Sequence, residues 1–206
     1  MKLLYQTHSP FARKVLVFTY EIGLEKNIDV VHHETSPTNR NEDVYRLNPL
    51  GKVPILITDD NKIIFDSSVI CNYLDGLHNK PKLIPQSRDH QIEAFRIEAL
   101  ADGMSEIGIQ ARWESERRPE KLRYPTLYKG LSDKLISSYH YIEDTVDLNN
   151  IPMLAQIALA TSLSWLAFRE LLPFDKGYPK LIRWYNDFIQ RDSMKATTLT
   201  GDTHDG

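Results

Sequence analysis

The chain has 206 residues, of which 41% are apolar and 26% are charged, as in an ordinary globular protein with a sizeable core. Its formal net charge of −3 gives no surplus of basic side chains, which a nucleic-acid-binding surface needs. The length suits one large domain or two small ones. The composition therefore argues for a globular protein and against a nucleic-acid-binding one.

The chain contains one cysteine, Cys71, so no intramolecular disulfide can form, which is typical of a reducing compartment. The first ten residues lack the apolar core of a signal peptide. The longest apolar run, residues 153–168, falls short of the roughly 20 residues that span a bilayer. We therefore expect a cytoplasmic protein that does not associate with membranes.

Residues 1–80 alternate between strand and helix patterns. Gly23 is suited to end a first helix, and Pro49 to stop a second. Asp66 and Ser67 offer N-caps for a third. The expected order, β-α-β-α-β-β-α, consists of a strand at 3–5, a helix at 11–22, a strand at 28–35, a helix at 42–47, a hairpin at 53–65 and a helix at 67–77.

Residues 87–206 show only helical patterns. Helices are expected from Ser87, at 126–146, at 153–168 and from Pro179. The apolar face of the first of these is expected to consist of Ile92, Phe95, Ala99, Leu100, Met104 and Ile107. We expect two domains, residues 1–80 and 87–206, joined by a linker at 78–86, and disorder after Leu199.

Three motifs occur in order in the first half: THSPFARKV, NPLGKVP and FDSSVICNYL. Together with YPKLIRWYNDFIQRDS near the end, they resemble the cytosolic glutathione transferase family, in its bacterial, serine-type form. The resemblance covers nearly the whole chain. It implies a thioredoxin-like N-terminal domain that binds glutathione, followed by an all-helical domain that holds a second substrate.

Pro54 is the residue on which the glutathione cleft depends in this resemblance. The local pattern alone favours a trans proline at the start of an edge strand. The resemblance instead implies a cis Val53–Pro54 bond, which X–Pro bonds alone adopt with any frequency. The N–H and C=O of Val53 would then face a cleft and pair with the cysteinyl backbone of glutathione, as in strand addition.

The resemblance also places the two ends of glutathione. The helix N-terminus at Asp66 and Ser67 would bind the γ-glutamyl end, with Ser67 and helix N–H groups on the carboxylate and Asp66 on the ammonium. Lys52 would reach the glycyl carboxylate. Glu106 would reach the ammonium of glutathione in the partner subunit of a homodimer. For Lys52 and Glu106 the alternative is a solvated surface residue.

Ser9 occupies the catalytic position of the resemblance, where a Ser-Pro pair also opens a helix in the ordinary way. A thiol of pKa ~8.5 needs about 2.7 kcal/mol of thiolate stabilisation to fall by two units. One hydrogen bond to a charged acceptor contributes roughly 1.5–3 kcal/mol, and a helix N-terminus about 0.3–1 kcal/mol. Ser9 can therefore suffice, although the nearby hydroxyl of Tyr5 could compete for the role.

The second-substrate pocket is expected between Phe11 and the long helices, near Arg112, Trp113 and Tyr124. No metal is implied: His32 and His33 are adjacent on a strand and point to opposite faces. The charge run at 113–121 is expected to be a solvated helix end.

The resemblance thus implies a homodimeric transferase that attaches glutathione to a small electrophile. Two alternatives stay open, a non-catalytic binding protein and another glutathione-dependent enzyme such as an isomerase or dehalogenase.

Overall fold

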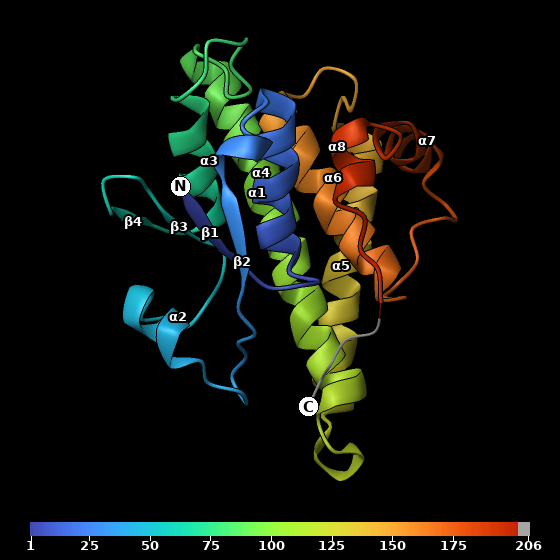
Figure 1. The fold of residues 1–206 in the computed structure, drawn as a ribbon. Helices are drawn as coiled ribbons and strands as arrows, with labels where there is room; N and C mark the ends of the chain where they lie inside the picture. Colours follow the sequence, from blue (N-terminus) through green and yellow to red (C-terminus); the bar gives the residue numbers. More distant parts are fainter. Residues whose placement is uncertain (202–206) are drawn as a thin grey trace.

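The computed structural model describes residues 1–201, which form a small sheet flanked by helices and a larger helical part (Figure 1). The sheet has the strand order β2-β1-β3-β4; β1 is parallel to β2 and antiparallel to β3, and β3 is antiparallel to β4. Its strands are β1 (Lys2–Tyr5), β2 (Asp29–His32), β3 (Ile55–Ile57) and β4 (Ile63–Ile64). Helices α1 (Pro10–Ile22), α2 (Glu42–Leu47) and α3 (Ser67–Asp75) complete the predicted β-α-β-α-β-β-α order. The thioredoxin-like fold is confirmed.

The sheet buries side chains on both faces, because successive residues of a strand point in opposite directions. Leu3 and Leu56 are paired across β1 and β3 and belong to the main core. Leu4 and Ile55, also paired, pack on the other face with Val44 of α2. Each face is therefore covered by its own helices.

Helix α1 begins and ends at the residues that the sequence indicated. The Ser9 side chain accepts a hydrogen bond from the Ala12 N–H, and Pro10 is the first helical residue. Gly23 ends the helix with φ of 76°, a left-handed conformation that glycine adopts without a Cβ penalty. The first turn of α1 is thereby fixed at the carboxyl end of β1.

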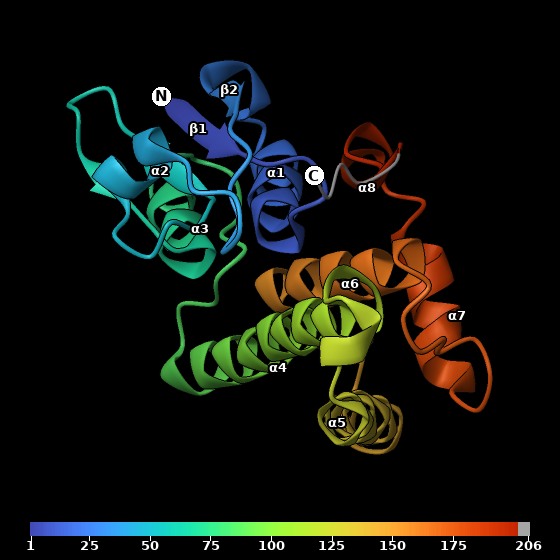
Figure 2. The same ribbon diagram turned by 90° about the horizontal axis from the view of Figure 1, so that it is seen from below.

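The rest of the described chain is helical, as predicted (Figure 2). Helix α4 packs against α5 on one side and against α6 on another, while α6 also contacts α1. The elements are α4 (Arg88–Arg112), a π-helical segment (Trp113–Arg117), α5 (Pro125–Thr145), α6 (Met153–Phe168), α7 (Pro179–Phe188) and α8 (Asp192–Ala196), with short 3₁₀ turns at Glu25–Asn27 and Glu120–Leu122.

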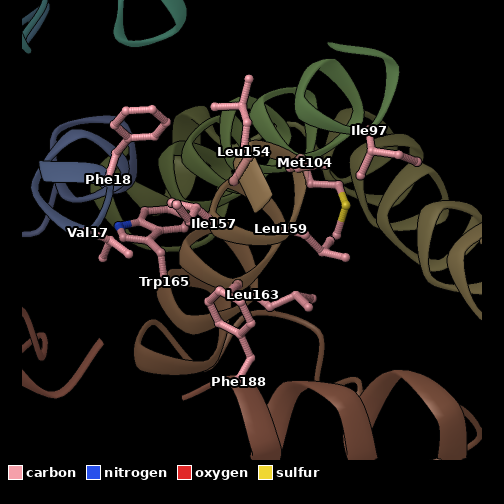
Figure 3. Packing of buried hydrophobic residues seen from close by; sticks show 14 of the residues in the cluster. Val17, Phe18, Ile97, Met104, Leu154, Ile157, Leu159, Leu163, Trp165 and Phe188 are labelled. Atoms are coloured by element: carbon pink, nitrogen blue, oxygen red, sulfur yellow. The ribbon is translucent and has the colours of Figure 1, made fainter. Parts of the chain in front are cut away.

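Helix α6 is the centre of the main core, which explains its apolar sequence on nearly every side. Its residues Leu163 and Trp165 pack among side chains of α1, α4 and α7, including Val17, Met104 and Phe188 (Figure 3). Gly108 of α4 makes this packing close, since a Cβ at this position would meet Leu166 at 2.6 Å. The sheet part and the helical part therefore share one continuous core.

The predicted apolar face of α4 was partly wrong. Met104 is fully buried, but Ile92 is 48% exposed and Ala99 is also exposed. The buried side instead includes Glu98, which is only 3% exposed. Ala94, Ile97, Ala101 and Met104 on this side also follow helical spacing, so the sequence pattern was compatible with either face.

The segment between α3 and α4, which contains the predicted linker at 78–86, is held by buried Asp75. The Asp75 carboxylate accepts hydrogen bonds from the Leu83 N–H at 3.0 Å and the Ile84 N–H at 3.3 Å.

Across residues 1–201, none of the helices has the length and apolar character needed to cross a membrane. The disorder expected after Leu199 falls mainly on residues 202–206, which lie outside the described residues.

Candidate functional site

A cavity of about 480 Å³ lies between the loops of the sheet part and helices α4 and α6. The loop before α1 and the loop before β3 form one wall, and the end of α4 with the end of α6 forms the other. Of the residues expected at the site, Ser9, Phe11, Lys52, Val53, Glu106, Arg112 and Trp113 line it. The structure thus brings together residues that are far apart in the sequence.

Ser9 lies at the edge of this cavity as the N-cap of α1. Its Oγ accepts the Ala12 N–H at 3.2 Å. A hydroxyl has one donor hydrogen besides its acceptor lone pairs, so the Ser9 O–H can still donate to a bound group. Tyr5, the competing hydroxyl, is not among the residues that line the cavity, and burial raises the pKa of its phenol.

Two side chains of α6, Trp165 and Phe168, contact the loop that carries Ser9. His8 has a left-handed backbone with φ of 67°, which is uncommon for a residue other than glycine. The Trp165 Nε1–H donates to the His8 carbonyl at 2.7 Å, and the His8 ring packs against Phe168. The helical part therefore fixes the backbone immediately before Ser9.

The loop before β3 is ordered by its own side chains. Asn48 accepts the Leu50 N–H at 3.0 Å and donates to the Lys52 carbonyl at 2.9 Å. Gly51 has φ of 62°, and a Cβ there would meet the Tyr45 ring at 2.2 Å, so only glycine fits. The Val53–Pro54 peptide bond is cis, as is Phe65–Asp66. This loop places Lys52 and Val53 on the cavity wall.

Lys52 and Glu106 form an ion pair across the cavity wall, with Lys52 Nζ 2.9 Å from Glu106 Oε1. Glu106 was expected to reach a partner subunit's ligand. The structure instead places it beside the cavity of its own chain, because α4 runs past the loop before β3. Its role at a partner subunit's site stays a prediction.

Asp66 and Ser67 stand at the start of α3, outside the residues that line the cavity. The exposed Asp66 carboxylate caps the helix by accepting the Ser68 N–H at 3.1 Å. Ser67 is only 2% exposed. The helix N-terminus is formed as predicted, while a role for either side chain in ligand binding stays a prediction.

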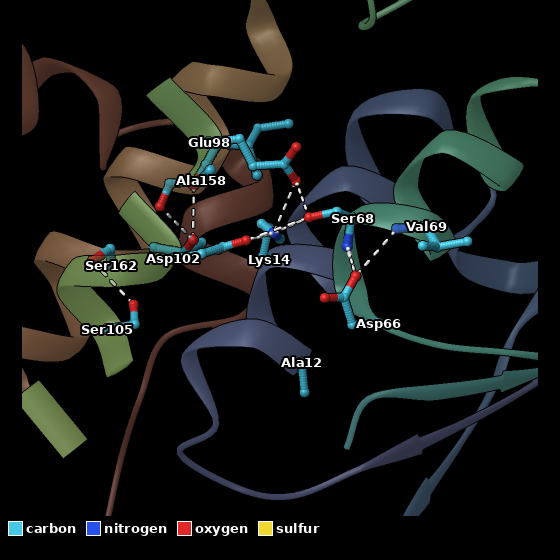
Figure 4. Close-up of polar contacts among 12 residues, drawn as sticks. Ala12, Lys14, Asp66, Ser68, Val69, Glu98, Asp102, Ser105, Ala158 and Ser162 are labelled. Carbon is cyan, nitrogen blue, oxygen red and sulfur yellow. Dashed lines mark hydrogen bonds and ion pairs between the residues drawn. The ribbon is translucent and has the colours of Figure 1, made fainter. Parts of the chain in front are cut away.

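Next to this helix start lies a buried ionic cluster that the sequence analysis did not identify (Figure 4). Lys14 Nζ, on α1, is 2.9 Å from Glu98 Oε1 and 2.7 Å from Asp102 Oδ2, both on α4. The Ser68 hydroxyl donates to Glu98 at 2.9 Å. The available signal was Lys14 itself, because it lies on the apolar face of α1, between Phe11 and Phe18 at helical spacing.

The cluster shifts the pKa of its members. Burial would lower the pKa of Lys14, but the Asp102 and Glu98 carboxylates raise it above its ordinary value. Burial raises the pKa of Asp102, and the negative charges of Glu98 and Asp66 raise it further. The Lys14 ammonium acts in the opposite direction and lowers this pKa. One lysine thus faces two carboxylates, which leaves the cluster negative beside the start of α3.

The far wall of the cavity was predicted in part. Arg112 and Trp113 lie on this wall and Phe11 faces the cavity from α1, but Tyr124 is not among the lining residues. Tyr124 is 60% exposed, and its N–H donates to Glu114 Oε2 at 2.9 Å, where the chain turns into α5. Glu114 is only 5% exposed, so the charge run at 113–121 is not fully solvated. The wall also contains Arg117, Trp165 and Arg169, which no local pattern could indicate.

No group of histidine, cysteine and carboxylate side chains among residues 1–201 could hold a metal ion. Cys71 is buried, as predicted, and burial raises the pKa of its thiol. The site therefore offers a hydroxyl, ordered backbone and several charged side chains.

Comparisons with known proteins agree on the family. Residues 8–77 match the family pattern "Glutathione S-transferase, N-terminal domain". The chain is 30% identical over 203 residues to the uncharacterized GST-like protein YibF of Escherichia coli (strain K12), covering 96% of this chain and 98% of YibF.

The chain is also similar to a glutathione transferase family member from Pseudomonas fluorescens Pf-5. The structure with bound glutathione has a TM-score of 0.93 at 30% identity, covering 97% of this chain and 99% of that one. The structure with bound S-(propanoic acid)-glutathione has a TM-score of 0.89 at 30% identity, covering 98% and 100%.

Proposed function

Since the chain belongs to the glutathione S-transferase family, we propose that it binds glutathione in the 480 Å³ cavity and attaches it to a small electrophile. The observation that carries this proposal is the position of Ser9. Ser9 lines the cavity at the N-terminus of α1, and its Oγ caps the helix. A thiolate at this point would meet both a hydroxyl donor and the positive end of a helix.

Ser9 acts in this proposal by stabilising the glutathione thiolate. Its hydrogen bond contributes roughly 1.5–3 kcal/mol, and the α1 N-terminus about 0.3–1 kcal/mol. Together they match the roughly 2.7 kcal/mol that lowers a thiol pKa by two units. No general base is required, because the thiol proton passes to solvent before the reaction.

The remaining parts of glutathione are held by the near wall and, outside the residues that line the cavity, by the start of α3. The Val53 backbone pairs with the cysteinyl residue, and Lys52 binds the glycyl carboxylate. Asp66, Ser67 and the N-terminus of α3 take the γ-glutamyl end. The negative cluster of Lys14, Glu98 and Asp102 favours the ammonium there, since Asp102 is close enough to Asp66 for their charges to interact.

The chemical step is a displacement or an addition by the bound thiolate. In a displacement on an activated aryl chloride, the sulfur forms a bond to the ring carbon, and chloride leaves with the electrons of the C–Cl bond. The enzyme contributes position and thiolate stabilisation. Binding of S-(propanoic acid)-glutathione by the Pseudomonas relative supports a cleft that accepts glutathione with a substituent on sulfur.

We further propose a cytoplasmic homodimer with a role in detoxification. Val69 on α3 and Ile92 on α4 are 51% and 48% exposed, and a second copy would cover these side chains. The lone, buried Cys71 supports a reducing compartment.

The test combines glutathione titration calorimetry with turnover of chlorodinitrobenzene by the wild-type protein. We expect glutathione to bind and the conjugate to form faster than without enzyme. Binding without turnover of any electrophile would favour a non-catalytic glutathione-binding protein. Absence of binding would contradict the proposal.

A further inference from the structure

Arg13, on α1, has a buried positive charge that no carboxylate of residues 1–201 compensates. The residue is only 3% exposed. Its guanidinium donates to Ser164 Oγ at 2.6 Å, to the Met194 carbonyl at 3.2 Å and to Thr197 Oγ1 at 3.4 Å. These acceptors satisfy the N–H donors but are all neutral. Because buried charges in proteins are ordinarily paired, the arrangement calls for a reason.

The Arg13 guanidinium lies on the side of the first turn of α1 that faces α6. Arg13 is one helical turn beyond Ser9, and its backbone N–H donates to the Ser9 carbonyl at 3.0 Å. Ser164, which accepts from the guanidinium, directly precedes Trp165. Trp165 in turn lines the cavity and donates to the carbonyl of His8. The charge is therefore close to the loop that carries Ser9, although Arg13 is not among the lining residues.

The Arg13 charge acts beyond its own hydrogen bonds, as the phenol of Tyr5 on β1 shows. Burial raises the pKa of Tyr5, and the Arg13 charge lowers it. The Tyr185 phenol, on α7, is the other ionisable group of residues 1–201 whose charge acts on Arg13. Phenols titrate near pH 10, so both are neutral near pH 7. A thiolate at Ser9 would supply the negative charge that the free protein lacks here.

Resting on the function proposed above, we propose that Arg13 stabilises the glutathione thiolate through space, from outside the cavity. Two charges about 10 Å apart at an effective dielectric constant of about 20 shift each other's pKa by roughly one unit. We therefore expect Arg13 to lower the pKa of the bound thiol by about 0.5–1. This effect adds to those of the Ser9 hydroxyl and the N-terminus of α1.

The setting of Arg13 suits this role. A guanidinium stays protonated throughout the range in which a thiol titrates, so its charge is constant. Its contacts with α6 and α8 fix its position before glutathione binds. A charge that is already oriented needs no reorganisation when the thiolate forms.

The test adds a counter-charge and leaves Arg13 in place. Ser164→Asp puts a carboxylate where the guanidinium already donates, and Ser164→Asn is the neutral control of the same size. We expect the thiol pKa of bound glutathione, from its thiolate absorbance, to rise by about 0.5–1 in Ser164→Asp. In Ser164→Asn it should stay at the wild-type value. Because a charge-assisted hydrogen bond is stronger than a neutral one, the aspartate variant is expected to fold.

Removing the charge gives a second test. Arg13→Met should raise the thiol pKa as Ser164→Asp does, and Arg13→Lys, which keeps the charge, should restore most of the shift. Lys195→Met is the control, because it removes the same charge from an exposed position on α8. Its thiol pKa should equal that of the wild type, since exposed charges are screened by solvent and salt. If Arg13→Met fails to fold, the comparison of the two Ser164 variants still decides.

Calorimetry at pH 8 with glutathione and S-methylglutathione separates the effect of charge from a structural one. In Ser164→Asp, glutathione should bind about three- to tenfold more weakly than in the wild type. S-methylglutathione cannot form a thiolate, so its affinity should not change. Equal weakening of both ligands, or an unchanged thiol pKa in Ser164→Asp, would overturn the role of Arg13 and leave that of Ser9 intact. A wild type that does not bind glutathione would overturn the proposed function itself.

Discussion

Lys14 Nζ lies 2.7 Å from Asp102 Oδ2, which joins the first helix of the sheet part to the first helix of the helical part. Lys14 is 1% exposed and Asp102 is 26% exposed. Glu98 completes the cluster at 2.9 Å from the same nitrogen. The two parts of the chain thus meet through a buried charge as well as through apolar packing.

We expect Lys14→Met to lower the free energy of unfolding by about 3 kcal/mol or more. Removing one partner of a buried ion pair leaves its counter-charges uncompensated, and here two carboxylates would face each other. Urea unfolding followed by circular dichroism measures the change. The control, Lys129→Met, breaks an exposed pair with Asp133 and should cost less than about 1 kcal/mol. Similar losses in both variants would contradict a structural role for the cluster.

The cluster also predicts a pH dependence. Because burial raises the pKa of Asp102, the folded state takes up this proton at a higher pH than the unfolded state does. The contribution of Asp102 to stability therefore increases as the pH falls through its folded-state pKa. We expect the stability of the wild type, relative to Asp102→Asn, to increase between neutral pH and a pH just above about 3.9. A constant or decreasing difference in urea unfolding would show that the shift has the opposite sign or is absent.

Two glycines of α4 provide a paired test of the packing between α4 and α6. At Gly108 a Cβ would meet Leu166 at 2.6 Å and Trp165 at 2.7 Å, whereas at Gly103 it would meet nothing within 4 Å. Gly103→Ala should stabilise the protein by about 0.5–1 kcal/mol, because alanine is the better helix former. Gly108→Ala should destabilise it by about 1–3 kcal/mol through overpacking. Thermal unfolding of both variants measures this, and a gain at Gly108 would refute the close approach.

Features encoded by neighbouring residues were predictable from the sequence. The start of α1 at Ser9 and Pro10, its end at Gly23 and the start of α7 at Pro179 follow from short local patterns. The helix of residues 153–168 was predicted with its observed bounds, because its apolar run is uninterrupted by glycine or proline.

Features that depend on contacts between distant segments were not predictable. Lys14 is 84 residues from Glu98, so no local pattern could indicate that these two side chains pair. Arg169 reaches the cavity only because α6 crosses behind the loop of His8, where Trp165 donates to the His8 carbonyl. Tyr124 was expected at the site, but at the turn before α5 its side chain is exposed to solvent.

The most direct test of the proposed function is a pH titration of the thiolate absorbance of glutathione bound to the wild type and to Ser9→Ala. In the wild type we expect a thiol pKa well below the free value of about 8.5. In Ser9→Ala it should rise by roughly one to two units, because the hydroxyl donor is lost. Ser9→Thr, which keeps a hydroxyl, should restore most of the shift, and Thr7→Ala, which removes a neighbouring hydroxyl, should leave the wild-type value. An equal thiol pKa in wild type and Ser9→Ala would contradict the role of Ser9.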